Sequence, residues 1–140
     1  MFDHATAADV TQLTLLRAYH KIHLFNNQHT FAPWLFTIAR RVAINVGKKE
    51  SKRNERSLND ETLSDVAEEN GNNLIQPLWK LALEILNKKS YQAMRLHYAE
   101  DLSIREIAKI MGKTETGIKV ILFRSRQKLG ATAKIRGISL

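Results

Sequence analysis

The chain has 140 residues, of which 44% are hydrophobic and 26% charged, a composition typical of a globular protein with one domain or two very small ones. It contains no cysteine, which excludes disulfides, cysteine-ligated zinc and a thiol nucleophile. No signal-peptide pattern opens the sequence and no apolar run approaches the ~18 residues of a membrane span, so we expect a cytoplasmic protein.

The formal net charge of +8 is concentrated in two blocks. Residues 31–56 hold seven basic and two acidic side chains, and residues 102–140 hold nine and two. Residues 57–73 between them hold five acidic side chains and no basic one. Many basic proteins are simply soluble, but two basic blocks on predicted helices favour a polyanion as the partner.

The first block of sequence predicts two helices. Thr6–Asp9 has the spacing of a capping box, so we expect a first helix over Thr6–Ile22, followed by a polar loop over residues 24–30. A second helix is expected from near Phe31, with Pro33 tolerated in its first turn. Apolar residues recur at helical spacing in both helices: Val10, Leu13 and Leu16, then Trp34, Leu35, Ile38, Val42 and Val46.

The polar side of the second helix is almost wholly cationic towards its C-terminal end. The chain then becomes acidic and poor in apolar residues, so residues 54–73 are expected to form a linker. The polar side consists of Thr37, Arg40, Arg41, Lys48, Lys49, Lys52 and Arg53.

Two further helices are expected over Leu74–Asn87 and Ser90–Ala99. Their apolar residues are core candidates. In the first helix these are Leu78, Leu81, Leu83, Ile85 and Leu86, and in the second Tyr91, Met94, Leu96 and Tyr98.

The stretch from Asp101 to Gly130 predicts a helix-turn-helix. Ser103–Glu106 is a capping box of the S-x-x-E form, and Gly112 suits the left-handed position that ends a helix. A three-residue turn leads to a second helix over Glu115–Leu129, which Gly130 is expected to stop. The residues expected to point inward are Ile104, Ile107, Ala108, Met111, Ile118, Ile121, Leu122 and Leu129.

An ordinary pair of antiparallel helices would have the same spacing, but the outward face of the second helix favours DNA binding. An exposed aromatic side chain among cations is unfavourable unless it contacts a partner. In a major groove it would meet a thymine methyl group while the cations bind phosphates or guanine edges. The face contains Thr116, Lys119, Phe123, Arg124, Arg126 and Lys128.

Two motifs near the N-terminus and two near the C-terminus resemble those of the sigma-70 superfamily. In particular, they are similar to the motifs of small sigma factors of the extracytoplasmic-function (ECF) type, which are built from regions 2 and 4. LSIREIAKIMG at Leu102–Gly112 and GIKVILFRSR at Gly117–Arg126 are similar to the helix-turn-helix of region 4. DVTQ at Asp9–Gln12 and FAPWLFTIAR at Phe31–Arg40 are similar to region 2.

The resemblance implies an all-α fold of two small helical domains joined by an acidic linker, the C-terminal one a helix-turn-helix of the winged-helix-like type. Its divisions would be residues 1–53 for region 2, 54–73 for the linker, 74–130 for region 4 and 131–140 for a tail. The implied function is that of an alternative sigma factor, which binds core RNA polymerase and promoter DNA and directs transcription initiation. An anti-sigma factor is a further implied partner, and no cofactor, metal or enzymatic activity is expected.

The resemblance also assigns roles to residues. The −35 element would be read by the recognition helix and its cap: Thr114, Thr116, Lys119, Val120, Phe123, Arg124 and Arg126. The −10 element would contact the second helix at Arg40, Arg41, Asn45, Lys48, Lys49 and Lys52, with Asn26, Asn27 and Phe31 as candidates for holding an unpaired base. Asp9 and Gln12 would contact the polymerase.

Four departures from the family pattern stand out. Leu13, Arg41 and Ile121 replace a usual Glu, Asn and Arg, and the sequence is expected to begin inside region 2, without the family's first helix. Either the start is truncated or another surface covers the helices that remain. We therefore expect an uncovered apolar face, a marginally stable segment 1–53 and an independently folding segment 74–130. Five residues cannot all be buried between two helices: Leu15, Leu16, Tyr19, Trp34 and Ile38.

Three other interpretations stay open from sequence. A sigma-like decoy or adaptor would explain the missing helix but would not need two cationic faces, and a plain helix-turn-helix regulator would not need the Trp34–Arg40 motif. An enzyme would need a catalytic or metal-binding pattern; there is no glycine-rich phosphate loop, and the histidines have no ligand spacing. They are His4, His20, His23, His29 and His97.

Overall fold

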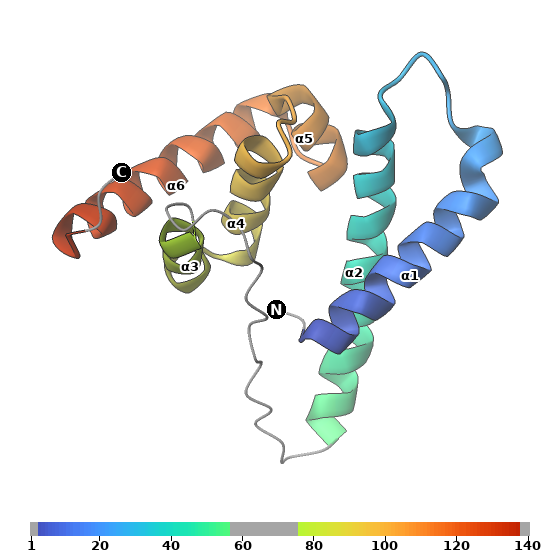
Figure 1. The fold of residues 1–140 in the computed structure, drawn as a ribbon, viewed down its shortest axis with the longest axis horizontal. Coiled ribbons are helices and arrows are strands. Elements are labelled where there is room, and N and C mark those ends of the chain that lie inside the picture. Colours follow the sequence, from blue (N-terminus) through green and yellow to red (C-terminus); the bar gives the residue numbers. More distant parts are fainter. Residues whose placement is uncertain (1–2, 57–75, 138–140) are drawn as a thin grey trace. The chain divides into compact units, whose positions relative to one another are not determined.

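A computed structural model of the chain describes residues 3–56 and 76–137, and within these ranges every regular element is a helix (Figure 1). The all-α prediction is therefore confirmed. The chain divides into two compact units, Met1–Glu68 and Glu69–Leu140, which we call the N-terminal and C-terminal units. Each unit is described by itself.

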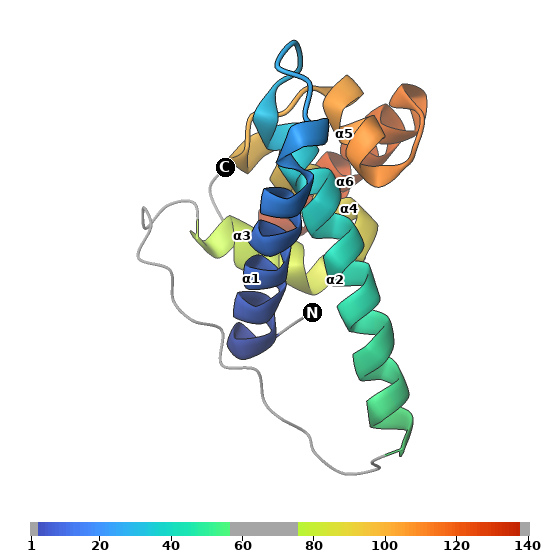
Figure 2. The same ribbon diagram turned by 90° about the vertical axis from the view of Figure 1, so that its right-hand side faces the viewer.

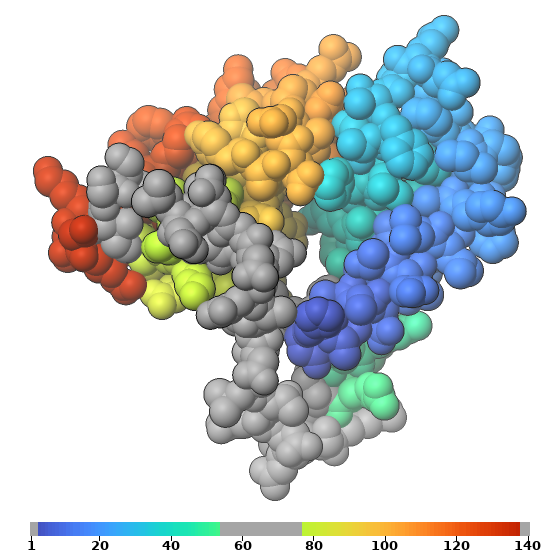
Figure 3. Space-filling view, in the orientation of Figure 1, coloured from blue at the N-terminus to red at the C-terminus, as the bar shows by residue number. Residues whose placement is uncertain are grey.

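The N-terminal unit is a pair of helices. Helix α1 spans His4–Lys21 and is followed by a single 3₁₀ turn at Ile22–Leu24, and helix α2 spans Phe31–Arg56. The two helices lie side by side, with atoms of α1 packed along one side of α2, and α2 extends past the beginning of α1 (Figures 2 and 3). The two predicted helices are confirmed, and α2 runs to Arg56, into the predicted linker; the remainder of that linker, residues 57–73, lies outside the described residues.

Helix α1 begins before its predicted start. The N-cap is Asp3, whose carboxylate accepts a hydrogen bond of 2.7 Å from the backbone N–H of Thr6. Hydrogen bonding to Thr6, through its side chain and its backbone, lowers the pKa of the exposed Asp3 carboxyl. The hydroxyl of Thr6 donates instead to Glu50 Oε1 on α2 at 3.0 Å. The predicted capping box at Thr6–Asp9 is wrong: α1 begins at His4 with Asp3 as its cap, so Thr6 lies inside the first turn of the helix.

A small core joins α1 to α2. On α1 the buried residues are Thr14 and Ala18, and on α2 they are Ile38 and Val42. The hydroxyl of Thr14 donates to its own helix, at 2.6 Å from the carbonyl oxygen of Val10, so its burial leaves no unpaired donor. The predicted stripe of α2 is confirmed as core or as partly buried residues packed against it: Trp34, Leu35, Ile38, Val42 and Val46.

The predicted inner face of α1 is wrong in part. Val10 packs against the core, but Leu13 is 44% exposed and Leu16 is 57% exposed. The contact uses residues at intervals of four, Val10, Thr14 and Ala18, because their short side chains let the two helix backbones approach closely. The long leucines of α1 consequently remain outside.

The C-terminal unit consists of four helices and one π-helical turn. Helix α3 spans Gln76–Ile85, α4 spans Lys88–Met94 with a π-helical turn over Arg95–Ala99, α5 spans Ile104–Met111 and α6 spans Glu115–Ile135. Helices α3, α4 and α5 all pack against α6. Helix α4 begins two residues before its predicted start because the Asn87 side chain accepts a hydrogen bond from Ser90 N at 2.8 Å and caps it.

The helix-turn-helix forms as its sequence predicts. Ser103 and Glu106 make both hydrogen bonds of the capping box, at 3.1 and 3.2 Å, and Gly112 ends α5 with φ of 64°. Thr114 then caps α6 by accepting a hydrogen bond of 3.0 Å from Gly117 N. Most of the residues predicted to point inward are buried: Ile107, Ala108, Met111, Ile118, Leu122 and Leu129. The other two, Ile104 and Ile121, are half-buried.

The predicted end of α6 at Leu129 is wrong. Gly130 lies inside the helix, which continues to Ile135. Leu129 and Ala133 are both buried, so packing extends the helix across the glycine. Beyond the last turn, Arg136 Nη1 lies 2.9 Å from Glu84 Oε2 of α3.

Two glycines of the helix-turn-helix unit provide a matched test of stability. Neither Gly112 nor Gly130 has an atom within 4 Å of the position where a Cβ would stand. Gly112→Ala should therefore lower the free energy of unfolding by about 1–2 kcal/mol, through backbone strain alone. Gly130→Ala should raise it by about 0.5–1 kcal/mol, because alanine favours a helix interior.

Urea unfolding followed by Trp79 fluorescence measures both effects. Trp34→Phe removes the other of the two tryptophans, so that the signal reports the C-terminal unit. A Gly130→Ala variant no more stable than its parent would contradict a continuous α6.

Candidate nucleic-acid interface

The exposed face of α6 is mixed apolar, polar and cationic. Val120 and Phe123 point outward at 40% and 54% exposure, so apolar surface lies among the polar and cationic side chains of this face. Three polar residues are also exposed and make no hydrogen bond or ion pair with other described residues: Thr116, Lys119 and Arg124. A shallow, mainly apolar depression lies at the start of the helix, lined by Lys113, Thr114, Thr116, Gly117, Val120 and Ile121.

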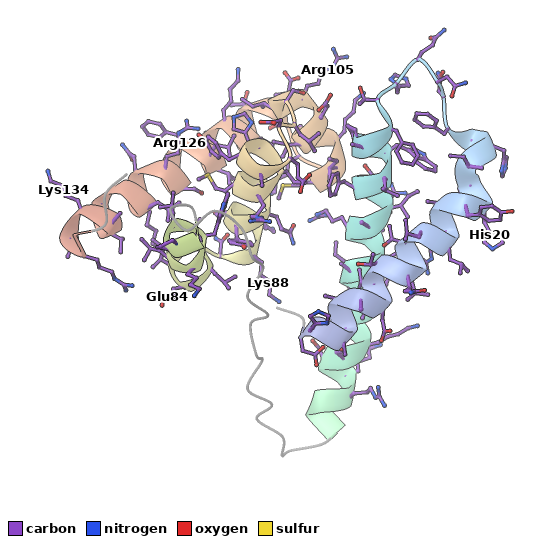
Figure 4. All side chains as sticks on the ribbon, in the orientation of Figure 1. His20, Glu84, Lys88, Arg105, Arg126 and Lys134 are labelled. Carbon is purple, nitrogen blue, oxygen red and sulfur yellow. The ribbon has the colours of Figure 1, made fainter. Side chains whose placement is uncertain are left out.

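Two predicted −35 residues are already engaged within the protein. The Thr114 hydroxyl holds the N-cap of α6. Arg126, labelled midway along α6 in Figure 4, donates from Nη1 to the Tyr98 hydroxyl at 2.9 Å. The sequence predicts Tyr98 in the core, but it is 47% exposed and lies beside the recognition helix. Its hydrogen bond spans 28 residues of sequence, so no local motif indicates it.

A second cationic surface runs along α2. Arg41, Asn45, Lys48 and Lys52 are exposed and recur at intervals of three or four, so they lie on one face, with the exposed Lys49 beside it. Arg40 is half-buried, and the Thr37 hydroxyl donates to the Pro33 carbonyl oxygen at 2.8 Å. We call Arg41, Asn45, Lys48, Lys49 and Lys52 the α2 cationic face.

The loop between α1 and α2 is supported by an aromatic cluster. The rings of Phe25, Phe31 and Trp34 lie 5.4–5.6 Å apart in all three pairs. Above it, Asn26 closes a turn: its side chain accepts from Gln28 N at 3.0 Å and its carbonyl accepts from His29 N at 2.9 Å.

The three residues predicted to hold an unpaired base differ in how the turn and the aromatic cluster engage their side chains. The Asn26 side-chain oxygen accepts a hydrogen bond within the turn, and the Phe31 ring packs in the cluster while staying 45% exposed. Asn27 is exposed and makes no hydrogen bond with the described residues. His29 is equally exposed and is a residue that the sequence reasoning missed. The turn-prone sequence at residues 26–29 is the signal that indicates both.

Helix α1 presents a continuous apolar face away from α2. Leu15 and Tyr19 are 56% and 77% exposed, and Ile22 and Leu24 continue the surface. Asp9 and Gln12 are exposed on the same helix. The predicted uncovered face is therefore confirmed for Leu15, Leu16 and Tyr19, whereas Trp34 is half-buried and Ile38 is buried.

Within residues 3–56 and 76–137 there is no group of three or more side chains that would bind a metal ion. None of the helices described in these ranges has the length and apolar character to span a membrane.

Comparisons with known families match both units. The family model for sigma-70 region 2 matches residues 1–53, and the model for sigma-70 region 4 matches residues 78–129. A helical pair with a cationic face, followed by a helix-turn-helix with an exposed mixed face, thus corresponds to a transcription initiation factor. The chain belongs to the sigma-70 family and is an alternative sigma factor of the ECF type, which directs transcription initiation.

Individual relatives agree with this assignment. The chain is 31% identical to the ECF RNA polymerase sigma factor SigM of Bacillus subtilis over 137 residues, covering 92% of this chain and 80% of SigM. It is 31% identical to the ECF RNA polymerase sigma factor BldN of Streptomyces coelicolor over 131 residues, covering 89% of this chain and 50% of BldN.

A solved structure has a similar fold. It is the sigma factor RpoE of Bartonella quintana in complex with the anti-sigma factor NepR. The TM-score is 0.80 at 27% identity, and the match covers 95% of this chain and 84% of RpoE. Neither this structure nor the sequence relatives support a decoy, a plain helix-turn-helix regulator or an enzyme.

Substitutions of Thr114 and Thr116 distinguish a helix-capping role from a proposed DNA-contacting role. Thr114→Ala should lower the free energy of unfolding of the C-terminal unit by about 1 kcal/mol, because it removes the cap of α6. Thr116→Ala should change it by less than about 0.5 kcal/mol, because this side chain is exposed and makes no hydrogen bond with the described residues. Chemical denaturation of both variants measures the difference; equal destabilisation would contradict the assignment of the cap.

Proposed function

We propose that α6 reads the −35 element of the promoter, that the α2 cationic face contacts the DNA around the −10 element, and that α1 contacts core RNA polymerase. Region 2 function would reside in residues 1–53 and region 4 function in residues 74–130, joined by the linker 54–73, with residues 131–140 as a tail. The observation that supports this proposal most strongly is the presence of two cationic faces that the described acidic residues leave unpaired.

The −35 assignment rests on the side chains of α6. Lys119 and Arg124 supply donors for guanine edges or phosphates, and Thr116 supplies a hydroxyl for either base type. Val120 and Phe123 offer no hydrogen bond, so their exposed surfaces match the thymine methyl groups of a major groove. Phosphate contacts would provide affinity, and this mixed face would provide sequence preference.

Replacing Lys119 or Arg124 by Ala should weaken binding of the polymerase holoenzyme to its promoter by ~1–3 kcal/mol if the side chain reaches a base edge. Fluorescence anisotropy with a labelled promoter fragment measures the effect. Lys88→Ala is a matched control, because this exposed lysine lies at the first residue of α4 and outside α6 and its cap (Figure 4). Wild-type binding by the Lys119→Ala, Arg124→Ala double variant would refute the −35 assignment.

The −10 assignment combines the α2 cationic face with the loop at residues 26–30. Bases that leave the duplex expose edges and faces for hydrogen bonding and stacking. Asn27 and His29 stand exposed on a loop that the Phe25–Phe31–Trp34 cluster supports. The α2 cationic face would bind the DNA phosphate backbone, while the loop at residues 26–30 would hold an unpaired base.

Lys48→Gln, Lys49→Gln and Lys52→Gln together should reduce opening of promoter DNA. The slope of log affinity against log salt concentration should become shallower by about 0.9 for each phosphate of duplex DNA that the variant no longer neutralises. Permanganate reactivity of unpaired thymines in the holoenzyme complex measures opening. Wild-type opening by the triple variant would reject the assignment, and Asn27→Ala should reduce opening with no change in the salt slope.

The proposed polymerase contact is the exposed side of α1, with Asp9 and Gln12 as its polar residues. The RpoE neighbour was solved with an anti-sigma factor, and we extend that kind of partner to this chain. A factor that works with RNA polymerase on promoter DNA would act in the cytoplasm and would perform no covalent chemistry of its own.

A further inference from the structure

The hydroxyl of Tyr98 lies outside the helix-turn-helix yet contacts the recognition helix. Arg126 Nη1 donates to it at 2.9 Å, and the contact is exposed to solvent. Arg126 follows Lys119 by seven residues, which is about two helical turns, so the two cations lie on the same side of α6. Tyr98 therefore extends a row of DNA-facing side chains with a residue from a different element.

The position of Tyr98 is set by an unusual backbone. Arg95–Ala99 forms a π-helical turn, which inserts one residue and redirects the side chains that follow. After it, Asp101 adopts a left-handed conformation with φ of 55°, which aspartate takes more readily than most residues with a Cβ. π-helical turns are frequent at functional sites.

Neighbouring contacts hold this turn in place. His97 Nδ1 donates to the carbonyl oxygen of Leu102 at 2.9 Å, and the His97 ring meets the Tyr98 ring edge to face at 4.8 Å. Arg95 stacks on Trp79 at 4.8 Å. These contacts support the turn that carries Tyr98, which lies five residues ahead of the Ser103 cap of α5.

We propose that Tyr98 and Arg126 together bind one phosphate of the promoter backbone, with Tyr98 both contacting the phosphate and positioning Arg126. The Tyr98 oxygen accepts from Arg126 and keeps its own O–H to donate, and the guanidinium keeps its remaining N–H donors. A phosphate oxygen beside the pair would accept from both groups. In a helix-turn-helix the first helix crosses the DNA backbone, and Tyr98 lies just before that helix.

This inference rests on the proposed −35 function of α6, and a double-mutant cycle on the full chain in polymerase holoenzyme tests it separately. The variants are Tyr98→Phe, Arg126→Gln and their combination, measured by affinity for a promoter fragment at several salt concentrations. Tyr98→Phe should weaken binding about fivefold, and Arg126→Gln should weaken it more and lower the salt slope by about 0.9. The double variant should bind more weakly than Arg126→Gln alone but should lose less affinity than the sum of the two single losses, because Tyr98 also positions Arg126 on the shared phosphate.

Tyr91→Phe is the matched control. Tyr91 lies on α4 with its ring against Trp79, and its hydroxyl makes no hydrogen bond with the described residues, so this variant should bind like the wild type. Single methylphosphonate substitutions along the −35 strands then locate the contact. Neutralising one particular phosphate should weaken wild-type binding while leaving the affinity of the double variant unchanged.

Two results would overturn the inference. One is Tyr98→Phe binding as tightly as Tyr91→Phe; the other is Tyr98→Phe and Arg126→Gln effects that simply add, with no phosphate specific to the pair. If Lys119→Ala and Arg124→Ala also bind normally, the proposed −35 function fails as well. If only the Tyr98 effects are absent, the proposed −35 function of α6 stands, and the Tyr98–Arg126 hydrogen bond only stabilises the fold.

Discussion

Helix α5 packs across α6 through fully buried side chains, and the direction of every proposed −35 contact depends on this packing. Ile107, Ile118 and Leu122 are almost completely inaccessible to solvent. The left-handed Gly112 and the Thr114 cap set the turn that brings the two helices together. With the buried side of α6 held in this way, the helical period leaves Thr116, Val120 and Phe123 no orientation except outward. The mixed exposed face is thus a consequence of the core.

The N-terminal unit has a much smaller core than the C-terminal unit. Among its described residues, two helices bury only four completely or nearly so, and α1 keeps a broad apolar face in solvent. Such a surface is unfavourable for an isolated helical pair, but it suits a factor that works inside a larger assembly. The α2 cationic face likewise leaves like charges close together. Binding to a polyanion relieves that repulsion, so affinity from this face is sensitive to salt.

The sequence is most informative where local chemistry decides the structure. Ser103 with Glu106, Gly112 and the apolar spacing of α5 and α6 all indicate the same turn, and the structure has it. It is less informative where distant packing decides. Gly130 has the composition of a helix stop, yet burial of Ala133 carries α6 past it. Asp3 caps α1 locally, and the Thr6 hydroxyl donates instead to Glu50 on α2, a contact over 44 residues that the sequence around Thr6 does not indicate.

The residues of the candidate interface are likewise predictable from the sequence only where local periodicity decides their exposure. The exposure of Val120, Phe123 and the lysines of α2 follows from helical periodicity, so those residues are predictable. The use of Asn26 within its own turn and the pairing of Tyr98 with Arg126 are not, because a hydrogen bond over 28 residues leaves no periodic signal. Residues whose side chains are already engaged, such as Thr114, look identical in sequence to those that are free.

Site-specific cross-linking in the holoenzyme tests most directly whether the two units contact the promoter as described. A photoreactive amino acid would replace Phe123 on the outer face of α6, Asn27 in the α1–α2 loop or, as a control, Gln92 on the exposed side of α4. The account predicts cross-links from position 123 to the −35 element and from position 27 to the −10 element, with none from position 92. Cross-linking of position 123 outside the −35 element, or equal cross-linking from position 92, would contradict it.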